Sequence, residues 1–304
     1  MKLPHLSDCR YLTWTGMETD LIFKGGIDLP GFASFPLLQK PDMRGRLESY
    51  AQKQIQVAAR HGLGTVLESA TWMANLDRAA ALGYNRSDLV EINRDAIALL
   101  AGVRDQCRAK NVLISANIGP RDDAYAPSDI MTVREAEHYH SAQIESLMGT
   151  AVDLLSAYTF SNSAEATGFV RAGRNAGLPS VVAFTVETDG RLPTGQTIDA
   201  AISEVDATTN AGAAYFMVNC AHPDHFSAVL TGNPRLAGIV ANASRCSHAE
   251  LDEATQLDEG DAAELGTQIA GLVANFPTIR VIGGCCGTDM RHLEEMASRV
   301  GGMT

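Results

Sequence analysis

The sequence lacks several features that would place it outside the class of soluble enzymes. No apolar run approaches the roughly 20 residues that a membrane-spanning helix needs, and the opening stretch MKLPHLSDCRYL has no apolar core of a secretory signal. No Gly-, Ser- or Pro-rich linker divides the 304 residues, and no solenoid repeat is present. We therefore expect one cytoplasmic domain over residues 1–304, with no membrane partner.

Positive charge and cysteine are also scarce. The chain has 24 Lys and Arg against 36 Asp and Glu, a formal net charge of −12, which disfavours a nucleic-acid partner. Six cysteines are too few for a disulfide scaffold. In a cytosolic chain, clustered cysteines more often bind a metal or take part in catalysis.

Short apolar runs alternate with longer amphipathic segments along the chain. Runs such as VLIS and FMVN are typical of parallel strands that are covered on both faces. We predict eight strands, at Tyr11–Trp14, Thr65–Glu68, Val112–Ala116, Asp153–Ala157, Ser180–Thr185, Tyr215–Asn219, Ala237–Ala241 and Arg280–Gly283. We predict helices at Arg46–His61, Ser87–Lys110, Ser163–Ala176, Thr197–Ala211, Asp261–Phe276 and Thr288–Val300, with Ser87, Ser163 and Thr197 at their starts. This alternation predicts an α/β protein with a single (β/α)8 TIM barrel; a doubly wound open sheet is the main alternative.

Three of the cysteines follow predicted strands. Cys220 ends the sixth strand in FMVNCAHP, and Cys285 and Cys286 end the eighth in VIGGCCGT. In a barrel, the carboxyl ends of all strands open onto one face, where active sites lie. Three cysteines with a vacant fourth position are typical of a catalytic zinc site. The adjacent pair alone would also suit a vicinal disulfide, and the isolated Cys9, Cys107 and Cys246 are expected to be small packing residues.

Zinc at such a site has a definite chemical use. A free thiol is mostly protonated at neutral pH, whereas coordination to zinc deprotonates it and leaves the nucleophilic thiolate. Gly283, Gly284 and Gly287 flank the cysteine pair and let the backbone bend so that both sulfurs face one ion. His222 and His225, just after Cys220, are candidate proton carriers; solvent-facing loop histidines are the simpler interpretation.

This set of residues resembles the homocysteine S-methyltransferase family, which includes betaine–homocysteine methyltransferase and part of cobalamin-dependent methionine synthase. The resemblance rests on the NC and GGCCGT motifs, on GMETDLIF at 16–23, TW at 71–72, IGP at 118–120 and EA at 165–166, and on FTVETDGRLPTGQ at 184–196. It implies a TIM barrel, zinc bound by Cys220, Cys285 and Cys286, and direct methyl transfer to a zinc-bound thiolate. Homocysteine is then the default acceptor, in methionine biosynthesis. The resemblance also makes Asn242 a candidate fourth ligand before substrate binds.

The residues expected to bind the amino-acid substrate depart from the family pattern. The family has an Asp-Gly pair where this chain has Trp14-Thr15, and a Glu after strand four where it has Tyr158. Two carboxylates that would face the substrate ammonium are therefore missing, and each such charge-assisted hydrogen bond is worth roughly 1.5–3 kcal/mol. The candidate substrate-binding residues are Trp14, Thr15, Gly16, Met17, Thr71, Asn117, Tyr158, Thr159, Thr185 and Glu187.

The expected partners are a small-molecule thiol and a sulfonium or ammonium methyl donor. Methyltetrahydrofolate is not expected as donor without a partner protein, because the sequence has no separate folate and cobalamin modules. The altered clamp leaves a different small thiol or a selenol as an alternative acceptor, and the same zinc chemistry also suits demethylation or carbon–sulfur cleavage. A third hypothesis is a non-catalytic barrel that binds a thiol or metal. A homo-oligomer is compatible with the sequence.

Overall fold

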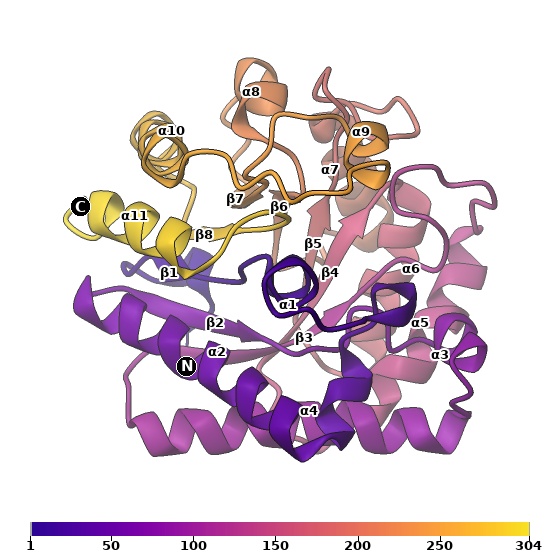
Figure 1. The fold of residues 1–304 in the computed structure, drawn as a ribbon. Helices are drawn as coiled ribbons and strands as arrows, with labels where there is room; N and C mark the ends of the chain where they lie inside the picture. The colour runs from indigo at the N-terminus through magenta and orange to yellow at the C-terminus, as the bar shows by residue number, and fades with distance from the viewer. Residues whose placement is uncertain (1, 304) are drawn as a thin grey trace.

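Eight parallel strands form a closed barrel in the computed structural model, which describes residues 2–303 (Figure 1). Each strand pairs with its neighbour in chain order, and β8 closes the barrel against β1. The predicted (β/α)8 barrel is confirmed, and the open-sheet alternative is wrong. The strands are β1 (Tyr11–Leu12), β2 (Gly64–Glu68), β3 (Val112–Ile118), β4 (Leu154–Phe160), β5 (Ser180–Phe184), β6 (Tyr215–Asn219), β7 (Leu236–Ala241) and β8 (Val281–Gly284).

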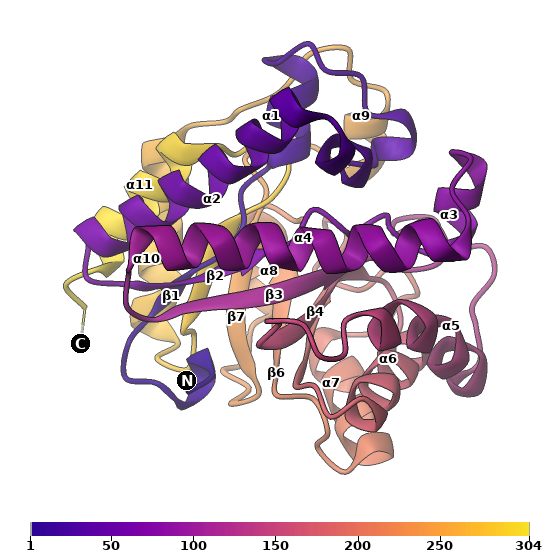
Figure 2. The ribbon, with the colours of Figure 1, turned by 90° about the horizontal axis from the view of Figure 1, so that it is seen from below.

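Helices surround this barrel on the outside. Figure 2 shows α4 lying along β3, and the helix α2 packs on β2. The longer helices are α2 (Pro41–Arg60), α4 (Arg86–Cys107), α5 (Val133–Ser146), α6 (Ser163–Asn175), α7 (Ile198–Thr209), α10 (Ala262–Asn275) and α11 (Met290–Val300). The shorter ones are α1 (Met17–Phe23), α3 (Leu76–Ala81), α8 (Pro223–Phe226) and α9 (His248–Asp252), with 3-10 turns η1 (Pro4–Leu6), η2 (Pro30–Phe32), η3 (Phe35–Gln39) and η4 (Ser227–Val229).

Two predicted helix caps are wrong because an asparagine, not the expected serine, provides the cap. The Asn85 side chain accepts hydrogen bonds from the N–H groups of Ser87 and Asp88, so α4 begins before the serine that was expected to cap it. In the same way the Asn162 side chain accepts from the N–H of Glu165 and caps α6 in place of Ser163.

Two further helix starts also differ from the prediction. The helix α2 begins at Pro41, five residues before the predicted Arg46, and proline suits the first turn of a helix. The helix α11 begins at Met290 with Asp289 as its cap. The hydroxyl of Thr288 is used elsewhere, because it accepts from the N–H of Gly16 and donates to the carbonyl of Cys285.

Strand lengths differ from the prediction where the barrel mouth is built. The strand β4 extends to Phe160, so Tyr158 and Thr159 lie inside it rather than after it. The strand β1 is only Tyr11–Leu12, and Trp14 lies beyond its end. Thr159 has a φ of +65°, and the pairing of β4 with β5 shifts register between Ala157 and Phe160. This irregularity carries the strand end away from a regular ladder at the mouth.

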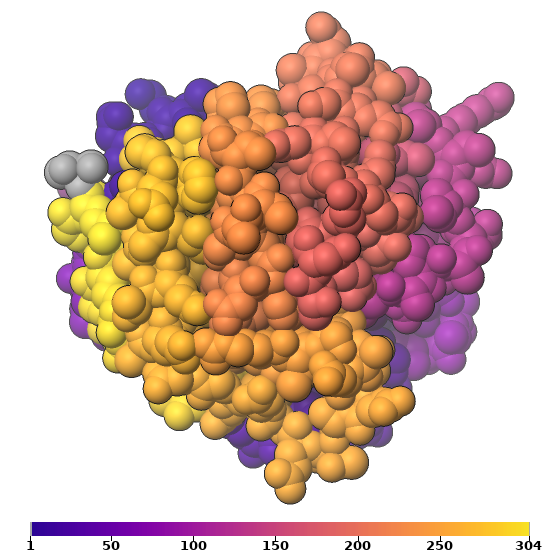
Figure 3. Space-filling model, turned by 90° about the horizontal axis from the view of Figure 1, so that it is seen from above, coloured from indigo at the N-terminus to yellow at the C-terminus, as the bar shows by residue number. Residues whose placement is uncertain are grey.

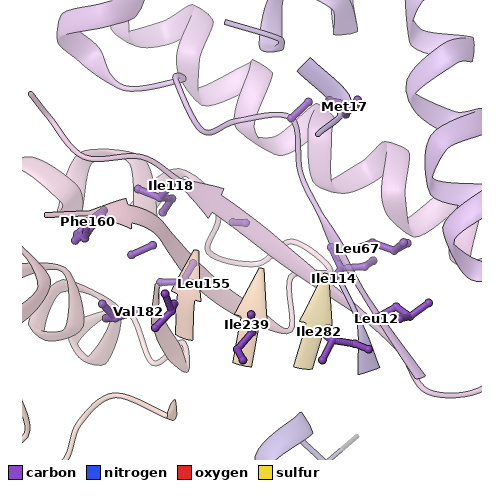
Figure 4. Packing of buried hydrophobic residues seen from close by; sticks show 14 of the residues in the cluster. Leu12, Met17, Leu67, Ile114, Ile118, Leu155, Phe160, Val182, Ile239 and Ile282 are labelled. Atoms are coloured by element: carbon purple, nitrogen blue, oxygen red, sulfur yellow. The ribbon is translucent and has the colours of Figure 1, made fainter. Parts of the chain in front are cut away.

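Apolar side chains pack on both sides of the strands. Figure 4 shows the outer layer, between strands and helices, to which Leu12, Leu67, Ile114, Leu155, Val182, Ile239 and Ile282 contribute. The alternate residues fill the barrel itself, which is therefore packed rather than hollow. They include Tyr11, Val66, Leu113, Leu154, Val181, Tyr215, Met217 and Val281.

In the space-filling view of Figure 3, the later part of the chain, coloured orange to yellow, forms one continuous region of the surface, with the early segments at its borders.

Within residues 2–303, no helix combines the length and the apolar character that a bilayer crossing requires.

Candidate metal centre and thiol pocket

The structure brings the three predicted sulfurs together at the carboxyl ends of β6 and β8. The Sγ atoms of Cys285 and Cys220 are 2.9 Å apart, and those of Cys286 and Cys220 are 3.6 Å apart. All three lie within 4.8 Å of one another. Cys220 and Cys285 are buried, and Cys286 is half-buried. The cluster therefore joins segments that are 65 residues apart in sequence.

Local backbone geometry directs these sulfurs toward each other. Cys220 has a φ of +57°, a conformation that non-glycine residues adopt at a cost of about 1–3 kcal/mol. Gly287 has a φ of +79°, which turns the chain after the cysteine pair. A Cβ atom on Gly16 would lie 2.4 Å from the carbonyl oxygen of Cys285, so only glycine fits where the first loop touches the pair. Strain at Cys220 is typical of a functional position.

The three thiols cannot all ionise without a cation. Hydrogen bonds from Cys285 and Cys286 hold the pKa of Cys220 well below its ordinary value. The hydrogen bond to Cys220 raises the pKa values of Cys285 and Cys286 well above theirs, with burial adding to the effect. Ionisation of Cys220 is thus favoured over that of its two neighbours, and a positive ion beside the cluster would favour ionisation of all three.

The donor set fits zinc. Tetrahedral zinc with Zn–S bonds of about 2.3 Å separates its sulfurs by about 3.8 Å. The 3.6 Å between Cys220 and Cys286 is close to this value, and the 2.9 Å between Cys220 and Cys285 is shorter. Asn242, the candidate fourth ligand, is near: its Nδ2 donates to the carbonyl oxygen of Cys220 at 3.0 Å. Its buried Oδ1 has no hydrogen-bond partner among the described residues. The residues present therefore suit one ion held by three thiolates, with Asn242 still a prediction.

Tyr125, which the sequence did not single out, also contacts the cluster. Its hydroxyl donates to Sγ of Cys220 at 3.0 Å, and its ring stacks on His248 with the centroids 3.8 Å apart. Burial, together with the nearby Cys220 sulfur, raises the tyrosine pKa well above its usual value, so the group stays a donor. The sequence carried no motif for this residue, because it lies in the irregular segment 119–132 between β3 and α5.

A small pocket next to the sulfurs collects half of the predicted substrate residues. It is lined by the three cysteines and by Trp14, Gly16, Asn117, Tyr158 and Thr159. The prediction missed its other lining residues, Glu18, Thr19, Phe32, Trp72 and Tyr125. We call this space the thiol pocket. Glu18 and Trp72 lie in the stretches GMETDLIF and TW, which carry the family resemblance. The sequence therefore indicated these stretches but not that the two side chains line the pocket.

The remaining predicted substrate residues lie elsewhere. Thr15 and Met17 line a separate pocket beneath α2 and α4. The hydroxyl of Thr71 donates to the carbonyl of Asn117, and that of Thr185 lies 3.4 Å from Nε2 of His248. Neither threonine, nor Glu187, lines the thiol pocket. A direct substrate contact for these five stays a prediction.

Tyr158 points toward a buried carboxyl group in the barrel interior. Its hydroxyl donates to Oε1 of Glu68 at 3.3 Å, and the hydroxyl of Thr13 donates to the same atom at 3.2 Å. Burial raises the pKa of Glu68 to about 7, while the neighbouring hydroxyls, including those of Ser115 and Ser156, lower it. Tyr158 thus lines the thiol pocket and also forms a hydrogen bond with Glu68 in the barrel interior.

A second buried carboxyl group lies in the thiol pocket itself. Glu18 is in the first turn of α1 and is 6% exposed. The Ser34 hydroxyl donates to its Oε1 at 2.9 Å. Burial raises the pKa of Glu18 to about 7, and the negative charge of Cys220 adds to the rise.

The two histidines after Cys220 form hydrogen bonds with groups other than the sulfurs. Nδ1 of His222 accepts from the N–H of Asp224 and caps α8, and burial lowers the His222 pKa to about 4. Nε2 of His225 contacts the carbonyl of Arg245. Neither lines the thiol pocket, so the structure gives no geometric support for a proton carrier.

A wider cavity adjoins the thiol pocket. Its volume is about 430 Å³. The two spaces share the lining residues Thr19, Phe32, Trp72, Tyr125 and Cys286. Asn242, His248 and the carboxylates of Asp123, Asp252 and Asp258 line the wider cavity but not the thiol pocket. Of the three cysteines, Cys286 lines both spaces, whereas Cys220 and Cys285 line the thiol pocket.

Comparison with known sequences gives a consistent result. A family model described as homocysteine S-methyltransferase matches residues 16–300. The methionine synthase of Mycobacterium tuberculosis is 29% identical over 143 residues, which are 43% of this chain and 11% of that protein. The methionine synthase of Mycobacterium leprae is also 29% identical over 143 residues, 10% of its length. The match thus spans about a tenth of these relatives.

Solved structures with the same fold come from Escherichia coli. The metallated form of the homocysteine methyltransferase MmuM is 18% identical, with a TM-score of 0.74 and 97% of each chain covered. Its oxidized form is 19% identical, with a TM-score of 0.75, covering 98% of this chain and 100% of the other. At this identity the likeness concerns the fold.

Proposed function

The chain belongs to the homocysteine S-methyltransferase family, as its sequence indicated, and we propose that it is a zinc-dependent S-methyltransferase. The acceptor is a small thiol, homocysteine by default, and the donor is a sulfonium or ammonium compound. The observation that carries the proposal is the meeting of the Cys220, Cys285 and Cys286 sulfurs at the barrel mouth. The Escherichia coli relative is described as having a metallated form, which supports a metal here.

The three cysteines would hold the ion. When bound, zinc supplies the positive charge that lets a substrate thiol lose its proton at neutral pH. In the transfer, the thiolate sulfur forms a bond to the methyl carbon as the bond from that carbon to the donor's sulfur or nitrogen breaks. The donor leaves as a neutral thioether or tertiary amine, and the thiol proton goes to solvent.

The two adjoining spaces suit two substrates. We assign the acceptor to the thiol pocket, next to the cysteines, and the donor to the cavity of about 430 Å³. Phe32, Trp72 and Tyr125 line both spaces and form an apolar wall at their junction, which excludes water from the reacting atoms. Alignment of the attacking sulfur, methyl carbon and leaving group accounts for much of the rate in such a reaction.

A different thiol, or a selenol, remains the second candidate acceptor. Its basis is the pair of replacements Trp14-Thr15 and Tyr158 at positions where the family resemblance led us to expect carboxylates. Tyr158 is engaged with Glu68 inside the barrel, so it does not restore a charge in the pocket. Demethylation and carbon–sulfur cleavage use the same metal site and differ only in their products.

The test is a transfer assay with zinc-loaded protein. Methyl-labelled S-methylmethionine, S-adenosylmethionine and betaine are each offered with homocysteine, other small thiols and a selenol, and products are identified by mass spectrometry. We expect label on the acceptor sulfur or selenium for at least one pair. Label released to water would favour demethylation, and a cleaved carbon–sulfur bond in the thiol product would favour a lyase. Tight thiol binding at stoichiometric zinc with no turnover would favour a binding protein.

A further inference from the structure

Glu18 is a buried acid that the proposed chemistry does not use and that one side-chain hydrogen bond joins to the rest of the fold. It is 6% exposed, it lines the thiol pocket with the three cysteines, and Ser34 is the single side chain that donates a hydrogen bond to it in the described part of the chain. No Lys, Arg or His of residues 2–303 pairs with it, although such partners normally accompany a buried carboxylate. A carboxylate placed like this lacks its counter-charge.

The acidic groups that line the pocket around Glu18 have no basic counterpart there. Cys220, Cys285, Cys286 and Glu18 line it, and no basic residue of the described chain does. Even a divalent ion on three thiolates leaves the site net negative once Glu18 ionises. The pocket therefore favours a ligand that brings a positive charge.

Two further features of the wall suit a cation. Oδ1 of Asn117 is buried and has no hydrogen-bond partner among the described residues, so it is a second vacant acceptor in the same pocket. The rings of Phe32 and Trp72 line the pocket with their centroids 6.2 Å apart and nearly perpendicular, and aromatic faces attract ammonium and sulfonium groups. Acidic, amide and aromatic groups converge on one space.

We propose that Glu18 is the specificity residue that receives the positively charged group of a substrate in the thiol pocket, with Asn117 as a second acceptor. It thereby takes the place of the two carboxylates that Trp14-Thr15 and Tyr158 replace. The shared chemistry is an ammonium or onium cation, and its source is either the α-ammonium of the acceptor thiol or the charged head of the methyl donor. The inference rests on the proposed function for the identity of these substrates, but not for the binding itself.

The test is calorimetric binding to zinc-loaded protein, which does not depend on turnover. Homocysteine and 4-mercaptobutanoate form one matched pair, because they differ only in the ammonium group. Trimethylsulfonium ion is the probe for the donor's charge. Each is titrated into wild type, Glu18→Gln, Glu18→Asp and Glu91→Gln. Glu91 is an exposed residue of α4, so that last variant changes the net charge equally without touching the pocket. Zinc content and circular dichroism verify that each variant is loaded and folded.

We expect Glu18→Gln to weaken one cationic ligand by a factor on the order of 10–100, as for loss of a charge-assisted hydrogen bond, and Glu18→Asp to recover part of it. A loss for homocysteine but not 4-mercaptobutanoate assigns the cation to the acceptor. A loss for trimethylsulfonium alone assigns it to the donor. Unchanged affinity for all three ligands in folded, zinc-loaded Glu18→Gln overturns the inference. If Glu18→Gln does not fold, the same titrations compare Glu18→Asp with Ser34→Ala. Glu18→Asp moves the carboxylate and should weaken the cationic ligand, whereas Ser34→Ala keeps the carboxylate in place and should weaken it less.

The outcomes also separate this inference from the proposed function. Binding that depends on Glu18, without methyl transfer to any acceptor, would contradict the proposed function and support the cation site. Methyl transfer with the same KM for acceptor and donor in wild type and Glu18→Gln would support the function and contradict the cation site.

Discussion

Glu18 and Glu68 are two buried carboxyl groups near the same end of the barrel, and burial raises the pKa of each to about 7. They differ in what surrounds them. Glu68 lies among the hydroxyls of the barrel, including those of Thr13 and Tyr158, and lines the separate pocket beneath α2 and α4 rather than the thiol pocket. Glu18 accepts from one side-chain hydroxyl, that of Ser34, and lines the thiol pocket with the cysteines. Burial alone therefore does not identify a ligand-binding acid; the groups that share its pocket do.

The same contrast extends to the regions that hold the two residues. The hydroxyls around Glu68 in the interior belong to the protein itself, so changes there should act on stability. The mouth around Glu18 is completed by ions and ligands, so changes there should act on binding. Four substitutions sharpen or break this division.

The largest effect is expected for Cys285→Ala at the mouth. Loss of one thiolate leaves two ligands from the cluster, so zinc content should fall from one per chain toward zero, and methyl transfer should drop by a factor on the order of 10³ or more. Elemental analysis and the transfer assay measure the two effects. Cys246→Ala, at an exposed cysteine, is the matched control and should change neither. Full zinc content in Cys285→Ala would remove this residue from the ligand set.

The next effect is the pH dependence of stability that Glu68 imposes. Because its folded pKa of about 7 exceeds the ordinary 4.5, the folded state holds the proton more tightly. Its contribution to stability is therefore complete below about pH 4.5 and is lost as the pH rises to 7, a loss of about 3 kcal/mol. The buried Oε2, which has no partner among the described residues, is one reason why the ionised form is disfavoured.

Glu68→Gln should remove this loss. In urea unfolding of metal-free protein, the free energy of unfolding of the variant should rise relative to wild type between pH 5 and pH 8. Glu91→Gln should keep the wild-type profile. Parallel profiles for Glu68→Gln and wild type would mean that Glu68 is already ionised in the folded state at pH 5.

A smaller effect is expected for Tyr125→Phe. The variant keeps the ring that stacks on His248 but loses the hydroxyl that donates to Cys220. Loss of a hydrogen bond to a metal-binding side chain typically costs 10-fold or more in metal affinity, so zinc affinity should fall about tenfold. Competition with a chromogenic chelator measures it. An unchanged zinc affinity would show that the tyrosine moves off Cys220 when metal binds.

The smallest effect is expected for Tyr158→Phe. The change removes one donor to Glu68 and should lower the free energy of unfolding by about 1 kcal/mol at pH 8. Homocysteine affinity should change less than in Glu18→Gln. If the loss of homocysteine binding free energy exceeded the loss of unfolding free energy, the Tyr158 hydroxyl would belong to the substrate site. That result would contradict the division between interior and mouth.

The sequence predicted the parts of this molecule that depend on periodicity and on rare residues. Alternating apolar runs located all eight strands, and β6 has its predicted bounds, Tyr215–Asn219. The three cysteines were identifiable because each follows a strand, and in a barrel all strand ends converge. Asparagine caps at Asn85 and Asn162 were missed because a serine stood within two residues of each.

The parts that the sequence did not predict depend on loops folding over the mouth. Tyr125 reaches Cys220 across 95 residues, and Ser34 reaches Glu18 from a turn with no regular pattern. Nothing in local composition encodes such contacts. Glu18 stood in a matched stretch, yet its use became apparent only when the pocket and its lack of basic residues were known.

X-ray absorption at the zinc edge tests the central claim most directly. The account predicts one zinc per chain with three sulfur neighbours at about 2.3 Å and one lighter oxygen or nitrogen neighbour, which a fourth sulfur replaces when the acceptor thiol is added. Zinc with two or fewer sulfur neighbours in the resting protein, or no stoichiometric zinc after reconstitution under reducing conditions, would contradict it.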